Sequence, residues 1–124
     1  MAQSAVERFV RAAIKHGELE SARSRNRAFD ELVEAAFEIG EDEDKGRSTF
    51  AALLDHENHS VVHSAAWRLL WLDEPMARAS LERVSRDGPP LVGFSAEMTL
   101  KEWDAGRLTP PKNWERYRSK WERT

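Results

Sequence analysis

Apolar residues recur every three or four positions along most of the chain, which is the spacing of α-helices with one buried face. Residues 4–17 show the pattern first. Ser4 can cap the start of this helix, and Gly17 can adopt the left-handed conformation that ends one. The face that we expect to be buried consists of Val6, Phe9, Val10, Ala13 and Ile14.

Five further helices are expected by the same criterion, over residues 18–40, 47–56, 60–72, 74–88 and 94–106. Ser48 and Ser60 are the expected caps of the third and fourth helices, and Pro75 lies in the first turn of the fifth, where its missing amide proton costs nothing. Residues 88–93, GPPLVG, are expected to form a turn.

The side of each helix that faces the core follows from the same spacing. In the second helix we expect burial of Ala28 or Phe29, with Leu32, Val33, Ala36 and Phe37. In the fourth we expect Val62, Ala65, Ala66, Leu69 and Leu70, and in the last Phe94, Met98 and either Leu100 or Lys101.

The pattern therefore predicts an all-α fold, since no stretch alternates apolar and polar residues as a strand would. Short connections favour antiparallel neighbours, and helix pairs stacked side by side form a solenoid. We expect an array of about six helices over residues 1–108. A C-terminal tail, residues 109–124, is aromatic and basic and is expected to pack on this domain.

Residues 53–71, LLDHENHSVVHSAAWRLLW, resemble a HEAT-type repeat, in which a polar turn is followed by a valine and then by a pair of alanines. Val61, Ala65 and Ala66 match this pattern. Together with the stretches MARASLERV and LVGFSAEMTLKEWDAG, they make residues 30–108 similar to a small bacterial family of HEAT-like domains of unknown function. The resemblance implies a short HEAT-like array of antiparallel helix pairs and implies no activity.

The composition limits the classes of protein to consider. A chain of 124 residues with 40% hydrophobic and 33% charged residues is expected to form one soluble domain. No apolar run approaches membrane-spanning length, and no secretory signal is visible at the start. The absence of cysteine excludes disulfides and thiolate metal sites and fits a cytoplasmic protein.

Charge is distributed unevenly along the chain. Residues 1–106 hold 13 basic and 20 acidic side chains, whereas residues 107–124 hold 6 basic and 2 acidic ones. An acidic body repels nucleic acid, so binding of single strands by the tail is a minor alternative. The acidic run Glu41, Asp42, Glu43 and Asp44 is either a solvated loop or a patch that steers a basic partner.

Three histidines, His56, His59 and His63, lie within eight residues, with Asp55 and Glu57 beside them. Two imidazoles four residues apart on a helix can share a metal ion that a carboxylate completes, which would support a metal-dependent hydrolase or a metal sensor. The favoured interpretation is a polar turn, in which His63 lies at the margin of the buried face with a backbone or side-chain partner.

Aromatic residues supply the remaining candidate site. Trp67 and Trp71 add a second apolar arc to the fourth helix, which neighbouring helices are expected to cover unless it lines an exposed groove. Trp114, Tyr117 and Trp121 share one stripe of the tail if it is helical, and they are expected to cap the array or, alternatively, to bind a partner. No nucleophile elbow, phosphate loop or dinucleotide motif is present, and no cofactor is called for. We therefore expect a non-enzymatic protein-binding module of a bacterial cytoplasm. An immunity protein that neutralises a basic toxin, such as a nuclease, is one example.

Overall fold

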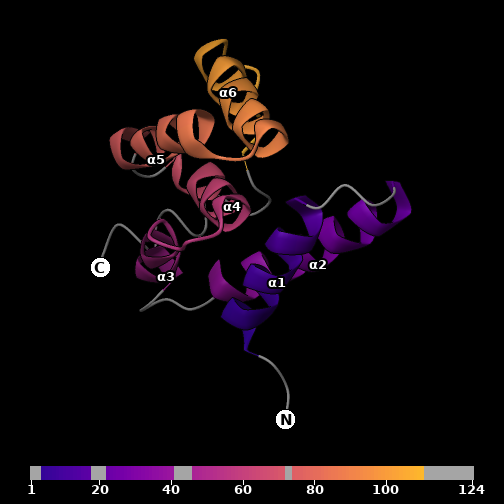
Figure 1. Ribbon diagram of the computed structural model, residues 1–124. Helices are drawn as coiled ribbons and strands as arrows, with labels where there is room; N and C mark the ends of the chain where they lie inside the picture. The colour runs from indigo at the N-terminus through magenta and orange to yellow at the C-terminus, as the bar shows by residue number, and fades with distance from the viewer. Residues whose placement is uncertain (1–3, 18–21, 41–45, 72–73, 111–124) are drawn as a thin grey trace.

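The computed structural model describes residues 4–17, 22–40, 46–71 and 74–110, and these ranges contain six α-helices and no strand. The helices are α1 (Ala5–Gly17), α2 (Ala22–Gly40), α3 (Gly46–Leu53), α4 (His59–Leu69), α5 (Glu74–Asp87) and α6 (Pro90–Asp104) (Figure 1). The prediction of an all-α fold with six helices is confirmed.

Helix α4 is the centre of the array. It packs against α3 and α5, its neighbours along the chain, and also against α1 and α6 (Figure 1). Its expected core face is confirmed, because Val62, Ala65, Ala66, Leu69 and Leu70 are all buried. Helices α1 and α2 pack together at one end of the molecule, and α5 and α6 pack together at the other.

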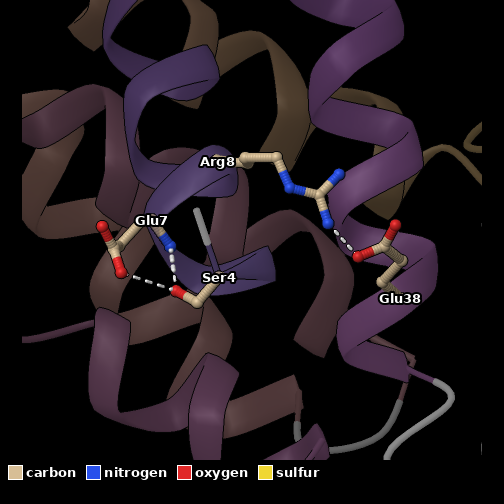
Figure 2. A network of polar contacts seen from close by, with 4 residues as sticks. All are labelled: Ser4, Glu7, Arg8 and Glu38. Atoms are coloured by element: carbon tan, nitrogen blue, oxygen red, sulfur yellow. Dashed lines mark hydrogen bonds and ion pairs between the residues drawn. The ribbon is translucent and has the colours of Figure 1, made fainter. Parts of the chain in front are cut away.

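The start of α1 is capped as its sequence predicts. The backbone amide of Glu7 donates a hydrogen bond of 3.1 Å to Ser4 Oγ, and the backbone amide of Arg8 donates to the Ser4 carbonyl oxygen. The side chain of Arg8 then reaches across to α2 and forms an ion pair with Glu38 (Figure 2). One turn of helix thus serves both to begin α1 and to attach it to its neighbour.

Helices α1 and α2 bury small residues and pack side by side. Ala12 and Ala13 of α1 are buried, as are Ala28 and Ala35 of α2. Alanine lets two helix backbones approach closely, because the distance between helix axes depends on the side chains at the contact.

The predicted face of α2 is therefore partly wrong. Leu32 is buried as expected, and of the two alternatives Ala28 and Phe29 it is Ala28 that is buried. Val33 and Phe37 are exposed, and Ala36 is only partly buried. The helix is rotated so that Ala28, Leu32, Ala35 and Ile39 face the core, which is an equally helical spacing with smaller side chains.

Helix α6 also turns small residues, and not bulky ones, toward the core. It begins at Pro90, so the expected turn over residues 88–93 is wrong beyond its first two residues. Gly93 and Ala96 are buried, whereas Phe94, predicted to be in the core, is exposed. A Cβ atom on Gly93 would lie 3.1 Å from the Ser85 carbonyl oxygen of α5, so this contact requires glycine or a shift of the helix.

Two predicted caps are also wrong. Asn58, and not Ser60, caps α4: Asn58 Oδ1 accepts hydrogen bonds from the amides of Ser60 and Val61, at 2.9 and 3.3 Å. Helix α3 begins at Gly46, two residues before the expected cap Ser48. Asn58 is favoured over Ser60 as the cap of α4 because its side-chain oxygen accepts from two backbone amides that have no partner within the helix.

Gly17 ends α1, but not through a left-handed backbone. Among the described glycines only Gly106, which follows α6, has a positive φ, of 72°. Gly17 is needed for space, because a Cβ atom there would lie 2.0 Å from Ser60 Oγ and 2.8 Å from Ser60 Cβ. The end of α1 thus rests directly on the first turn of α4.

The substitution Gly17→Ala tests this contact, since helix propensity and packing predict opposite signs. The higher helix propensity of alanine would by itself raise the free energy of unfolding by about 0.5–1 kcal/mol. We expect instead that the free energy of unfolding, measured with urea, falls by about 1–3 kcal/mol because the helices are forced apart. The double variant Gly17→Ala/Ser60→Gly removes the clashing atoms and should recover most of the loss, whereas simple addition of the two single effects would contradict the contact.

Candidate functional site

The three clustered histidines play separate roles. His56 Nδ1 accepts a hydrogen bond of 3.0 Å from the backbone amide of Asn58, which closes the turn between α3 and α4. His59 is the first residue of α4. His63 lies one turn further on, with Nε2 3.1 Å from Thr99 Oγ1 of α6.

These positions do not create a metal site. Within the described ranges, which include all three histidines as well as Asp55 and Glu57, no three histidine, aspartate or glutamate side chains are grouped so that they could hold an ion. The turn between α3 and α4 and the bond to α6 direct the imidazoles to different neighbours. The expectation that His63 lies at the margin of the core with a side-chain partner is confirmed.

His63 is held neutral by its surroundings. Burial, helped by the charges of His16 and Arg68, lowers its pKa from 6.5 to about 4. A neutral imidazole keeps one nitrogen as donor and one as acceptor, which suits the bond to the Thr99 hydroxyl. The perturbed pKa therefore results from packing between α4 and α6 and from nearby cations, with no carboxylate among its causes.

Arg68, one turn beyond Ser64 on α4, is also buried. Its guanidinium lies 5.3 Å from the ring centroid of Phe9 and 5.4 Å from that of Trp67, and it donates a hydrogen bond of 2.9 Å to the Ser64 carbonyl oxygen. Burial lowers its pKa to about 10. Aromatic faces attract a desolvated cation, so these rings offset part of the cost of removing the guanidinium from water.

Three partly exposed tryptophans, Trp67, Trp71 and Trp103, form a row of ring contacts next to Arg68. The rings of Trp67 and Trp71 meet edge to face with centroids 5.1 Å apart, and Trp71 meets Trp103 of α6 in the same way at 5.2 Å. Trp103 Nε1 donates a hydrogen bond to Glu74 at the start of α5. This tryptophan row is half-buried, and it joins α4, α5 and α6.

Sequence reasoning selected Trp67 and Trp71 but missed Trp103. A usable signal was present: Gly93, Ala96, Leu100 and Trp103 repeat at intervals of three, four and three, which is one helix face. Leu100 was among the expected core residues, but the exposed Phe94 was chosen for the core in place of Gly93, Ala96 and Trp103 because it is bulky and apolar.

The most exposed large apolar side chains lie on the two outer helices. On α6, Leu91 is 58% and Phe94 59% exposed, and the half-buried Met98 follows one turn later. On α2, Phe29, Val33 and Phe37 are 49%, 42% and 40% exposed. We call these groups the α6 stripe and the α2 stripe. Apolar residues gathered in this way mark surfaces that meet another molecule or segment.

The other residues predicted to contact a partner lie outside the described ranges. These are Glu41, Asp42, Glu43 and Asp44, which follow α2, and Trp114, Tyr117 and Trp121 in the tail. Leu108, the last residue of the predicted domain, packs against the core.

Comparison with protein-family models, with curated proteins and with solved structures found no significant match to the chain. None of the helices in the described ranges is both long and apolar enough to cross a bilayer.

The lowered pKa of His63 predicts that the protein loses stability in acid. The unfolded chain takes up the proton near pH 6.5 and the folded protein only near pH 4, so folding opposes protonation in this window. Stability contributed by neutral His63 is complete above about pH 6.5 and is lost as the pH falls toward 4, by up to about 3 kcal/mol.

Urea unfolding of wild type and of His63→Gln at several pH values between 7 and 4 measures this effect. The variant keeps an amide that can bond to Thr99 but cannot titrate, so its stability should fall much less over the window. If both proteins lose the same stability, His63 does not carry the acid sensitivity.

Proposed function

We propose that this protein is a non-enzymatic protein-binding module of the bacterial cytoplasm, built as a short HEAT-like array. The observation that supports this most directly is the α6 stripe. Leu91, Phe94 and Met98 follow the i, i+3, i+7 spacing with which a helix presents anchor side chains to a groove on a partner. Leu91 and Phe94 are both more than half exposed.

The surroundings of the α6 stripe favour tight binding. Gly93 and Ala96 hold one side of α6 against the core, and the tryptophan row fixes its last turns to α4 and α5. A helix that is already fixed loses little conformational freedom on binding, so more of the contact energy appears as affinity. Trp67, half-exposed beside Arg68, remains a second proposed contact for the partner.

The charge of the body suggests the partner's chemistry. Residues 1–106 carry seven more acidic than basic side chains, which accelerates encounter with a basic surface. Small acidic helical proteins of this kind include inhibitors that neutralise a toxic enzyme. We therefore propose an immunity-type inhibitor of a basic toxin, such as a nuclease, with Glu41 to Asp44 directed at the toxin's cationic site. This analogy rests on size, charge and architecture.

A binding role is also consistent with the chemistry of the perturbed groups. Catalytic sites shift pKa values by combining burial with a specific charge partner in a cleft. The two large shifts among the described residues, at His63 and Arg68, are caused first by burial between packed helices. Both side chains are engaged in contacts that hold α4 to α6 and to α1.

Quantitative affinity capture from a bacterial lysate tests the α6 stripe. Wild-type protein, Phe94→Glu and the control Ala79→Glu are immobilised, and bound proteins are identified by mass spectrometry. Ala79 is exposed on α5, so the control makes the same kind of change away from the stripe. We expect a basic protein to be retained by wild type and control, and its affinity for Phe94→Glu to fall at least about 30-fold, as for a central anchor residue.

The captured protein is then purified and titrated with wild type and both variants. Loss of its enzymatic activity at one equivalent of wild type would support the inhibitor proposal. Equal retention by Phe94→Glu and wild type, or the absence of any stoichiometric partner, would contradict binding through the α6 stripe.

A further inference from the structure

Helix α6 is joined to the central helix α4 through a hydrogen bond and a ring contact. His63 Nε2 of α4 lies 3.1 Å from Thr99 Oγ1 of α6, and the rings of Trp71 and Trp103 meet at 5.2 Å between centroids. Helix α6 packs more extensively on α5 than on α4. We call the contact between α4 and α6 the α4–α6 seam.

The hydrogen bonds of Thr99 determine which nitrogen of His63 carries the hydrogen. The Thr99 hydroxyl donates its one hydrogen to the Ser95 carbonyl oxygen at 2.9 Å, because a carbonyl oxygen can only accept. Thr99 Oγ1 must therefore accept a hydrogen bond from His63 Nε2. The neutral ring thus carries its hydrogen on Nε2, and a further proton can bind only at Nδ1.

A proton on Nδ1 of His63 would have no favourable neighbour. This nitrogen has no hydrogen-bond partner among the described residues. The charged groups that act on the ring are His16 of α1 and Arg68 of α4, and both oppose protonation. Helix α6 offers the uncharged Thr99 hydroxyl, and no charged group in the described parts of α3, α5 and α6 acts on the ring. Protonation therefore places a charge beside two cations without an acceptor or a carboxylate.

Separation of α6 is the smallest movement that brings water to this ring. Helix α4 is enclosed by α1, α3 and α5 on its other sides, whereas α6 lies at one end of the array (Figure 1). The polar bonds from α6 to α5, Trp103 to Glu74 and Arg78 to Asp104, are exposed and contribute little stability. Local opening of a peripheral element costs less free energy than unfolding of the whole domain.

We propose that protonation of His63 at Nδ1 opens the α4–α6 seam, so that α6 separates from α4 in mild acid while the other helices remain packed. Loss of the proton closes the seam again. This conformational device goes beyond the proposed binding role and belongs to the fold alone, so it holds whether or not α6 binds a partner.

The size of the effect follows from proton linkage. The pKa of His63 is about 4 with the seam closed and returns to 6.5 when the ring meets water. Because the open state binds the proton more readily, opening is favoured as the pH falls through the window from 6.5 to 4. Between pH 7 and pH 5 the opening equilibrium should rise about 20-fold.

Thiol labelling can measure this opening because the chain contains no cysteine. The reporter Ala96→Cys places a thiol on the buried face of α6. This position lies between Gly93, which contacts α5, and Thr99, which contacts α4, so it becomes accessible when the seam opens. An aromatic disulfide reagent labels the thiol at pH 7 and at pH 5.

Two further cysteines provide the references. Ala65→Cys is buried on the side of α4 away from His63, so its thiol reacts only when the whole array unfolds. Ala79→Cys is exposed on α5, and dividing each rate by the rate for this variant removes the effect of pH on the thiol itself.

We expect the corrected rate for Ala96→Cys to rise about 20-fold from pH 7 to pH 5 and to exceed that for Ala65→Cys at least about 10-fold. Adding His63→Gln should abolish the rise, because the amide does not titrate. Adding His59→Gln, a matched change at the start of α4, should leave it intact. Val92→Cys, half-buried on α6, is the second reporter if Ala96→Cys does not fold.

Equal corrected rates for Ala96→Cys and Ala65→Cys would assign the labelling to unfolding of the whole array and overturn the proposal. A constant rate at Ala96→Cys between pH 7 and pH 5, or a rise that persists with His63→Gln, would also overturn it. Purified protein alone is used, so the result is independent of whether α6 binds a partner.

Discussion

Close approach of helices through small side chains is the constraint on which this structure depends. Helices α1 and α2 bury alanines where they pack together, α6 lays Gly93 against the backbone of α5, and Gly17 rests on Ser60 of α4. Helix axes can approach closely only when the side chains at the contact are small, because the axis separation depends on those side chains. The positions of α2 and α6, and hence their outward faces, follow from these contacts.

The cost of this arrangement is that bulky apolar residues are left at the surface. A helical array usually ends in helices with polar outer faces, because each terminal helix lacks a neighbour on one side. Here the outer faces of α2 and α6 carry phenylalanine, valine and leucine. At the centre, α4 meets neighbours on most sides, which explains why it also contains a neutral histidine and a buried arginine enclosed by aromatic rings. The proposal of a partner that binds α6 follows from this distribution.

Much of the fold could be predicted from the sequence, whereas the orientation of its outer helices could not. Apolar spacing predicted six helices, the ends of α1 and α2 at Gly17 and Gly40, and the buried face of α4. It failed where two faces of one helix had the same period, because bulk was taken to mean burial: Val33, Phe37 and Phe94 were placed in the core. Choosing between such faces requires knowing the shape of the neighbouring helix, which a single sequence does not contain. The resemblance to HEAT-like domains and the protein-binding role stay predictions.

The most direct test of the central claim compares small inward residues with large outward ones. Unfolding by urea would be measured for Ala35→Leu and Ala96→Leu, and for Phe29→Ser and Phe94→Ser. Each alanine-to-leucine substitution should lower the free energy of unfolding by about 1–3 kcal/mol, because the larger side chain overpacks the helix contact. Loss of the exposed rings should cost less than about 1 kcal/mol, since a surface change outside special features has a small effect. The reverse order, with the phenylalanine variants losing 3 kcal/mol or more as core residues do, would contradict the account.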